Sequence, residues 1–355
     1  VHVSDASLVT GVCNNLTNDN LREAYVKEIY ADYDKARARF EKGRQAADLL
    51  TLEQARERRP VIDWASYEVP TPPRYGLSVW DDVPLERVAE YIDWTPFFHA
   101  WELKGVLDSE KYGEEARKLY ADGLEVLGRI LKDKPFALRA VTGYFPANSD
   151  GDDVIVYNYD DEGRALDTEM GRLHFLRQQK RKVKEEDPYY CLADFVAPVG
   201  NGKVDTVGAF CCTCGFEADA YARTFEEAGD DYTGIMVKAL ADRLAEALAE
   251  YLHKATRDWH GYGEVEGFKL ADPLPRATKQ SVNRYVDWMV KENYRGIRPA
   301  AGYPSCPDHL EKDALWAVLE AEAHTGVQLT VSRAMNPAAS VSGLYCHHPA
   351  SKYFN

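Results

Sequence analysis

The stretch LRAVTGYFPANSDGDDVIVYN, Leu138–Asn158, decides the fold class. Apolar and aromatic residues flank a polar segment that contains Gly151. This pattern predicts two strands, 138–146 and 153–158, joined by a short turn. Strands joined by so short a connection pair in the antiparallel sense. The stretch therefore predicts an antiparallel strand pair.

The remaining periodicities surround this pair with more strands and with groups of helices. Further strands are predicted at 189–196, 205–213, 328–335 and 340–347. Helices are predicted at 84–92, 109–132, 166–181, 217–228, 230–256, 278–293 and 308–324. The helices are grouped between strand pairs and do not alternate regularly with single strands. This arrangement indicates an α+β fold with an antiparallel or mixed sheet.

The first 75 residues differ in pattern from the main body. Residues 1–17 predict a strand, a turn and a short apolar segment, which we interpret as the end of a preceding domain. Asn20 and Glu23 predict a capping box for a helix that ends at Gly43, and another helix is expected to start near Thr51. The predicted organisation is a domain remnant at 1–17, a helical linker with the Pro-rich connector VPTPPR (69–74) at 18–75, and the main domain at 76–355.

The net charge of this chain of 355 residues is −15. Nucleic acids and anionic membrane surfaces attract clusters of Lys and Arg, so the charge argues against both as partners. No apolar run approaches the roughly 20 residues that span a bilayer, and no segment resembles a secretion signal. We therefore expect a cytoplasmic protein.

The seven cysteines exclude a complete disulfide framework, because their number is odd. Cys211, Cys212 and Cys214 form the run C-C-T-C, which suggests either a metal site or buried thiols. Consecutive residues of a strand point to opposite faces, and the usual C-x-x-C spacing is absent. Buried free thiols are the favoured interpretation, and no metal site is predicted.

Familiar enzyme motifs leave the chain unassigned. Gly261, Gly263 and Gly267 superficially resemble a cofactor-binding glycine loop, but they follow a predicted helix and not an apolar strand, so we interpret them as a loop. The sequence contains no P-loop, no H-E-x-x-H pattern and no G-x-S-x-G nucleophile elbow.

Acidic residues recur on one face of the predicted helix 230–256. Asp242, Glu246 and Glu250 are four residues apart, so their carboxylates share a face and repel one another by roughly 0.2–0.5 kcal/mol per pair. Either this face is solvated, or a cation lies opposite it.

The segment R-P-A-A-G-Y, Arg298–Tyr303, combines residues that suit a small charged ligand. Arginine offers two parallel donors to a carboxylate, an aromatic ring can face a cation, and small residues let a ligand approach the backbone. Prolines stiffen the segment. Taken alone, however, a stretch rich in Pro and Gly is more typical of a simple turn.

Several long motifs closely resemble those of the C-terminal activation domain of cobalamin-dependent methionine synthases, in the same order along the chain. They are Tyr91–Phe98, Gly143–Asn148, Leu176–Gln179, Tyr190–Phe195, Tyr294–Lys312, Ala334–Tyr345 and Ser351–Phe354. The resemblance implies a C-shaped α+β module with a bent, mainly antiparallel sheet flanked by helices and preceded by a helical linker. It also implies a methyltransferase function in methionine biosynthesis.

The resemblance further implies that this domain binds S-adenosylmethionine. The family's ligand-contacting positions correspond here to Asp93, Glu246, Arg298, Ala300, Gly302, Tyr303 and Tyr353. We expect Arg298 to bind the ligand carboxylate, and Asp93 and Glu246 to face its cationic or hydroxyl groups. The two tyrosines would border the methyl end. Glu250 is interpreted as structural, and no catalytic acid or base is predicted.

In this family the domain reactivates oxidised cobalamin by reductive methylation. The implied partners are the cobalamin-binding domain of the same polypeptide, of which VHVSDAS (1–7) resembles the last strand, and flavodoxin or a flavoprotein reductase as electron donor. Zinc would belong only to an N-terminal module outside this chain. Two alternatives remain: a non-catalytic docking module for the cobalamin domain and a flavoprotein, or a stand-alone reactivation protein that acts in trans. The VHVSDAS segment argues against a stand-alone protein, because such a protein has no use for part of another domain.

The sequence departs from the family pattern in three places. The interval between Trp259 and Tyr294 is longer than in many relatives, and Asn336 and Cys346 replace residues that are often aromatic. Relatives also continue beyond the position of Asn355. We therefore expect a truncated domain in which the end around Tyr353 is frayed.

Overall fold

The computed structural model describes residues 9–45, 49–81, 83–101, 103, 113–266 and 291–355. The chain divides into two compact units. The first consists of residues 1–58 and 179–188, and the second of 59–178 and 189–355. The predicted helix 278–293 and the VHVSDAS segment fall largely or wholly outside the described residues.

The first unit contains the helices α1 (Val9–Thr17), α2 (Asp19–Gln45) and α3 (Leu52–Glu57). Residues 9–17, for which the sequence predicted only a short apolar segment, form a helix, because a helix satisfies its own backbone groups whereas a strand needs a partner. The predicted capping box at Asn20 is also misplaced: the Asn18 side chain accepts the Asn20 N–H at 3.0 Å. The start of α3 is as predicted, with Thr51 and Gln54 forming a reciprocal capping box.

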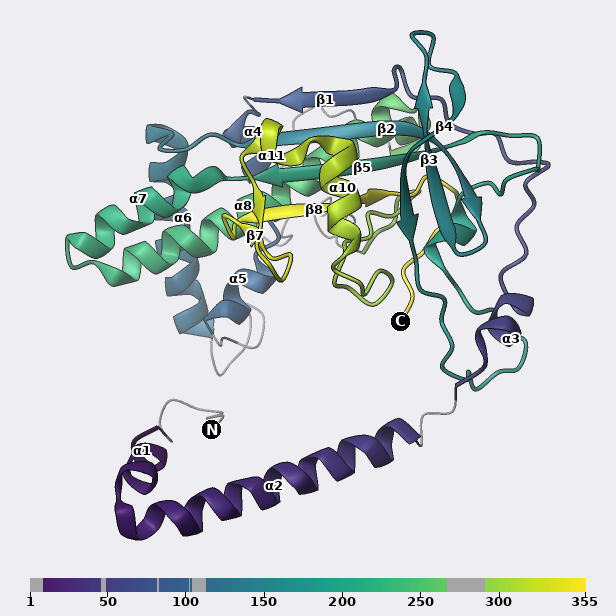
Figure 1. Ribbon diagram of the computed structural model, residues 1–355. Coiled ribbons are helices and arrows are strands. Elements are labelled where there is room, and N and C mark those ends of the chain that lie inside the picture. The colour runs from purple at the N-terminus through teal and green to yellow at the C-terminus, as the bar shows by residue number, and fades with distance from the viewer. Residues whose placement is uncertain (1–8, 46–48, 82, 102, 104–112, 267–290) are drawn as a thin grey trace. The chain divides into compact units, whose positions relative to one another are not determined.

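The second unit is built on a sheet in which every strand pair is antiparallel (Figure 1). Its strands are β1 (Gly76–Trp80), β2 (Arg139–Asp150), β3 (Asp153–Tyr159), β4 (Ala165–His174), β5 (Asp205–Thr213) and β8 (Ser340–Tyr345). Their order is β4-β3-β2-β5-β8, and β1 pairs with β2. A separate hairpin joins β6 (Gln328–Leu329) to β7 (Met335–Asn336). The predicted α+β class with a mainly antiparallel sheet is confirmed.

The long strand β2 changes partner along one edge. Residues 140–144 pair with β1, whereas 147–150 pair with β3. Pro146 lies between the two paired stretches on this edge, while on the other edge it stays in register with Thr206 of β5. This change of partner allows one strand to anchor two neighbours.

Helices cover both faces of the sheet (Figure 1). On one face lie α4 (Leu85–Ala89), α5 (Thr95–Ala100), α6 (Gly113–Asp133), α7 (Gly215–Glu227) and α8 (Asp231–Trp259). On the other lie α10 (Glu311–Leu319), α11 (Ala321–Thr325) and the 3-10 turn η2 (Leu192–Phe195). Cys212 belongs to the first core and Cys211 to the second, so these buried free thiols face opposite sides of β5, as predicted.

Helix α8 is the element that carries the predicted apolar stripe. Its residues Met236, Leu240, Leu244, Leu248 and Leu252 are at most 1% exposed. The helix begins at the cap Asp230, whose side chain accepts the Thr233 N–H at 3.0 Å. The short 3-10 turn η3 (Tyr262–Glu266) follows its end. No helix among the described residues is both long and apolar enough to cross a membrane.

The predicted helix 166–181 is wrong, because residues 165–174 form the edge strand β4. Leu166, Met170 and Leu173 have helical spacing, but Leu166 and Met170 remain 44% and 36% exposed. The spacing therefore did not mark a buried helix face. Pairing with β3 decided the conformation.

Three further boundaries differ from prediction. The expected strand 189–196 contains η2, because the Asp194 carboxylate accepts the Cys191 N–H at 2.8 Å and binds the buried Arg177 through two nitrogens. The expected strand 328–335 is the β6–β7 hairpin. The expected helix 308–324 is broken into α10 and α11 at Glu320, which has a φ of 48°.

Candidate functional site

The R-P-A-A-G-Y segment runs beside the end of β8. Ile297 exchanges two backbone hydrogen bonds with Cys346, at 3.0 and 3.1 Å, and Leu344 N–H donates to the Pro299 carbonyl at 2.9 Å. A residue before proline favours the extended conformation, which suits this strand-like contact. Arg298 is thereby held at the edge of the sheet.

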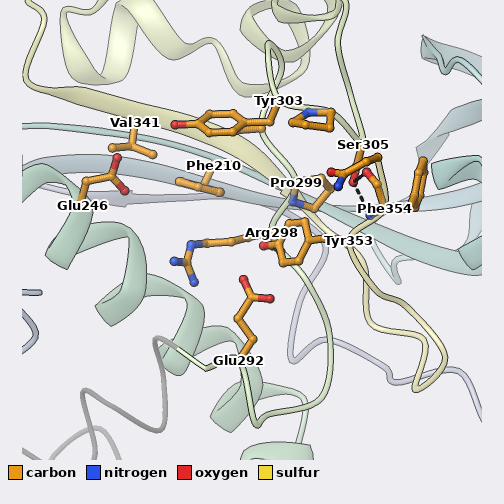
Figure 2. Close-up of a pocket in the computed structure, with 13 residues that line it drawn as sticks. Phe210, Glu246, Glu292, Arg298, Pro299, Tyr303, Ser305, Val341, Tyr353 and Phe354 are labelled. Carbon is orange, nitrogen blue, oxygen red and sulfur yellow. Dashed lines mark hydrogen bonds between the residues drawn. The ribbon is translucent and has the colours of Figure 1, made fainter. Parts of the chain in front are cut away.

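Two adjoining clefts open beside this segment, with volumes of about 300 and 390 Å³. Both are lined by Glu246, Glu292, Arg298 and Tyr303. Ala300 and Tyr353 also line the first cleft, and Asp93 lines the second. In Figure 2 the Arg298 side chain extends toward α8, between the labelled Glu246 and Glu292. The structure thus brings six of the seven sequence-predicted positions to these clefts.

Gly302 is the exception, because it lines neither cleft. Its φ of 101° lies in the region that favours glycine, and a Cβ there would lie 2.3 Å from the His309 ring. Its N–H donates to the Cys306 carbonyl at 2.8 Å. Gly302 therefore shapes the turn that presents Tyr303.

Arg298 is held by acceptors on two sides. Nη1 donates to the Tyr294 hydroxyl at 2.9 Å, and Nη2 forms an ion pair with Glu250 Oε1. Burial opposes the positive charge, but the Glu250 carboxylate outweighs this effect, and the pKa of Arg298 stays well above its ordinary value. The Nε–H has no acceptor among the residues that the structure describes. That donor is available to a ligand.

Glu250 was predicted to be structural, and the structure places it in the site. Besides pairing with Arg298, it lines the second cleft, and its Oε2 is buried without a hydrogen-bond partner in the described part of the chain. The spacing of Glu246 and Glu250 on one helix face was the sequence signal for this arrangement. The cation that relieves their repulsion comes from a distant loop.

Glu246 carries a carboxylate with no ion-pair or hydrogen-bond partner within the described ranges. Burial raises its pKa above the ordinary value, while Arg298 and then Arg243 oppose the shift. Arg243 itself is paired with Asp242 at 2.5 Å. Glu246 is therefore a carboxylate that a cationic ligand would stabilise.

Several residues of the site carried no recognised sequence signal. Glu292 lines both clefts, and Phe210 of β5 and Val341 of β8 form an apolar part of the first. Burial is the main cause that raises the pKa of Glu292. Phe210, Val341 and Glu292 lie near Arg298 only because the folded chain brings β5, β8 and the loop before Arg298 together.

The C-terminal segment, which was expected to fray, is attached to the rest of the site. The Tyr353 hydroxyl accepts the Arg298 N–H at 3.1 Å. Ser305 Oγ accepts the Phe354 N–H at 2.8 Å and donates to the Phe354 carbonyl at 2.7 Å. The Phe354 ring also packs against Tyr190, with centroids 5.8 Å apart.

The clefts therefore combine one arginine, several carboxylates, tyrosine rings and an apolar patch. Such a set can bind and orient a small molecule that carries both a carboxylate and positive charge. Within the described ranges, no group of three or more His, Cys, Asp or Glu residues could hold a metal ion.

Comparison with known proteins now decides the family. The model of the "vitamin B12 dependent methionine synthase, activation domain" matches residues 84–355. The chain belongs to this family. A crystal structure of the MetH reactivation domain bound to AdoHcy is also similar, with 45% identity and a TM-score of 0.75. The match covers 86% of this chain and 89% of that one. The family resemblance inferred from the motifs is confirmed.

Proposed function

We propose that this activation domain binds S-adenosylmethionine in the clefts beside Arg298 and presents its methyl group for reductive methylation of cob(II)alamin in methionine synthase. The observation that carries the proposal is the juxtaposition of Arg298 with Glu246, Glu250 and Glu292. S-Adenosylmethionine carries a carboxylate, an ammonium and a sulfonium, so it needs both kinds of partner. Its demethylated product, AdoHcy, is bound by the similar reactivation domain.

The residues present fit such a ligand. Arg298 Nε is a donor for the carboxylate, and Glu250 Oε2, which has no hydrogen-bond partner in the described ranges, is an acceptor for the ammonium. Glu246, which has no ion-pair or hydrogen-bond partner among the described residues, would compensate the sulfonium charge. Phe210 and Val341 offer apolar surface to the uncharged parts. Tyr303 and Tyr353 border the same cleft.

The chemistry requires positioning more than proton transfer. When bound, S-adenosylmethionine would supply an electrophilic methyl group. Cobalt reduced by one electron would provide the electron pair of the new bond, and the sulfur would keep the pair of the broken C–S bond. Arg298 and the carboxylates hold and orient the donor, so no residue of this chain needs to act as a general acid or base.

The proposed partners follow from the same scheme. Cobalamin would be carried by the neighbouring domain of the same polypeptide, and flavodoxin or a flavoprotein reductase would deliver the electron. The proposal places this work in methionine biosynthesis in the cytoplasm.

Calorimetric titration of the chain with S-adenosylmethionine and AdoHcy tests ligand binding directly. Binding should be saturable, and ligand at 100 times its dissociation constant should stabilise the fold by about 2.7 kcal/mol. Methyl transfer is tested in the full-length enzyme, by following methylcobalamin formation under reducing conditions with and without Arg298→Ala. A chain that binds the cobalamin domain but neither ligand would be a docking module, and the proposal would be wrong.

A further inference from the structure

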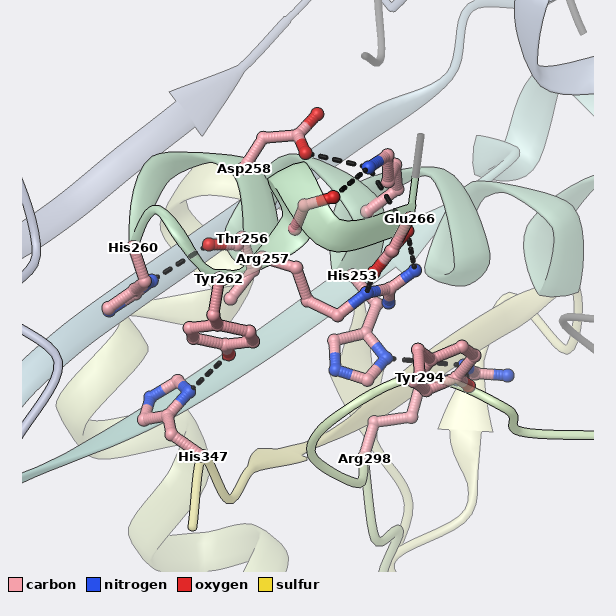
Figure 3. Close-up of polar contacts among 12 residues, drawn as sticks. His253, Thr256, Arg257, Asp258, His260, Tyr262, Glu266, Tyr294, Arg298 and His347 are labelled. Carbon is pink, nitrogen blue, oxygen red and sulfur yellow. Dashed lines mark hydrogen bonds and ion pairs between the residues drawn. The ribbon is translucent and has the colours of Figure 1, made fainter. Parts of the chain in front are cut away.

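A layer of buried polar side chains lies behind Arg298 (Figure 3). His253 and Arg257 come from the last turns of α8 and are 1% and 0% exposed. Tyr294 comes from the loop that leads into Arg298. None of these side chains lines the two clefts. Their contacts with Arg298 and with each other therefore serve something other than direct ligand contact.

The strongest of these contacts to Arg298 is made by Tyr294. Its hydroxyl accepts from Nη1 at 2.9 Å, whereas His253 Nδ1 lies at 3.5 Å from the same nitrogen, the outer limit of a hydrogen bond. Burial and the nearby Arg257 hold the pKa of His253 well below its ordinary value, so its ring is neutral and does not repel the guanidinium.

Tyr294 is itself held on two sides. The Arg257 guanidinium lies 3.9 Å from the centroid of its ring, and the His253 ring meets it edge-on, with centroids 5.1 Å apart. Glu266 in η3 forms an ion pair with Arg257 and thereby fixes the stacked cation. A ring held in this way cannot turn its hydroxyl away from Arg298 without breaking buried contacts.

We propose that Tyr294 is a positioning residue that aims the Arg298 guanidinium at the ligand carboxylate. A free arginine side chain samples many rotamers, and ordering it on binding costs affinity. Before the ligand binds, Tyr294 already accepts one hydrogen bond from Nη1 of Arg298, and Glu250 accepts one from Nη2. The guanidinium plane is set in advance, with Nε left for the ligand. This inference rests on the proposed function.

The test is Tyr294→Phe, which keeps the ring against Arg257 and removes only the hydroxyl. Calorimetry should show that S-adenosylmethionine and AdoHcy bind about five- to tenfold more weakly, the effect of one lost hydrogen bond to a charged group. 5′-Methylthioadenosine has the adenosine and thioether but no carboxylate. Its affinity should change less than about twofold.

Tyr262→Phe is the matched control. Tyr262 is also a buried tyrosine of this layer, and its hydroxyl bonds to His347 Nδ1 at 2.8 Å, but it does not contact Arg298. Its loss should lower the melting temperature about as much as Tyr294→Phe and leave the affinities for all three ligands unchanged.

The possible outcomes separate the two proposals. If the unaltered chain binds neither S-adenosylmethionine nor AdoHcy, the proposed function is wrong. If it binds both and Tyr294→Phe leaves their affinities unchanged, or weakens all three ligands equally, the positioning role is overturned. If methylthioadenosine binds too weakly to be measured, a double-mutant cycle replaces that comparison. In an Arg298→Met background, Tyr294→Phe should cause no further loss of affinity for S-adenosylmethionine. A fully additive loss of affinity in the double variant would also overturn the positioning role.

Discussion

Arg298 forms an ion pair with Glu250, a residue 48 positions earlier in the chain, on the buried side of the candidate site. The pair joins the R-P-A-A-G-Y loop to helix α8. It supplies the cation that the acidic face of α8 requires, and it fixes a guanidinium at the border of two clefts. The charged side chains of the proposed site are therefore already held in place by contacts within the protein, before a ligand binds.

Replacing Arg298 should weaken the binding of S-adenosylmethionine. We expect Arg298→Ala to cost about 2–3 kcal/mol in calorimetry, part of it because Glu250 is left without its cation. Arg333→Ala removes an exposed ion pair to Asp313 at 2.8 Å and should leave ligand affinity intact. Equal affinities of Arg298→Ala and the unaltered chain would disprove the assignment.

Gly302→Ala should reduce both stability and affinity, because the new methyl group meets the His309 ring in a backbone conformation that alanine rarely adopts. Gly151 also has a positive φ, of 67°, but open space around its Cβ position. Gly151→Ala should therefore cost only about 1–2 kcal/mol in urea unfolding and leave binding unaltered. An equal loss for the two variants would show that the contact with His309 has no effect.

Binding should tighten as the pH rises, through Glu246. Burial raises its pKa above the ordinary 4.5; Arg298 and Arg243 oppose this shift, whereas Asp242 and Glu250 add to it. The protonated Glu246 carboxyl therefore stabilises the folded chain fully at a pH below the pKa that Glu246 has in the unfolded chain. This contribution is lost as the pH rises through the higher pKa that Glu246 has in the folded chain. A sulfonium nearby favours the ionised carboxylate, so binding in that range should release a proton.

Calorimetry in two buffers of different ionisation enthalpy measures this proton release. Glu246→Gln should bind S-adenosylmethionine more weakly, release fewer protons and show a flatter dependence of affinity on pH above 4.5. Were the proton release the same in both proteins, the titrating group would have to be a different one.

Ser305→Ala should loosen the C-terminal segment. It removes both hydrogen bonds to Phe354, one residue beyond Tyr353, and we expect faster amide hydrogen exchange at Tyr353 and Phe354. Affinity for S-adenosylmethionine should also fall. Ser351→Ala, which removes only a long contact of 3.4 Å to the Cys346 carbonyl, serves as the control. Unchanged exchange in Ser305→Ala would mean that other contacts hold the segment.

Local patterns in the sequence predicted much of the fold. The hairpin of β2 and β3, the apolar stripe of α8 and the opposite orientations of Cys211 and Cys212 all follow from residue periodicity, and the structure contains each of them. These features depend on neighbours a few residues away, so the sequence alone is sufficient to predict them. The R-P-A-A-G-Y motif indicated Arg298 as a ligand-binding residue only together with the family resemblance, because a stretch of this composition taken alone is more typical of a simple turn.

Tertiary contacts decided what periodicity could not. Residues 165–174 have helical spacing, yet pairing with β3 makes them a strand. Glu250 is one helical turn from Glu246, yet its role became clear only when a loop placed Arg298 against it. Tyr294 supports that arginine through a ring held by Arg257. The sequence alone thus determined which residues could bind a charged ligand. The fold determined which of their charges meet, because an ion pair depends on distance in space and not along the chain.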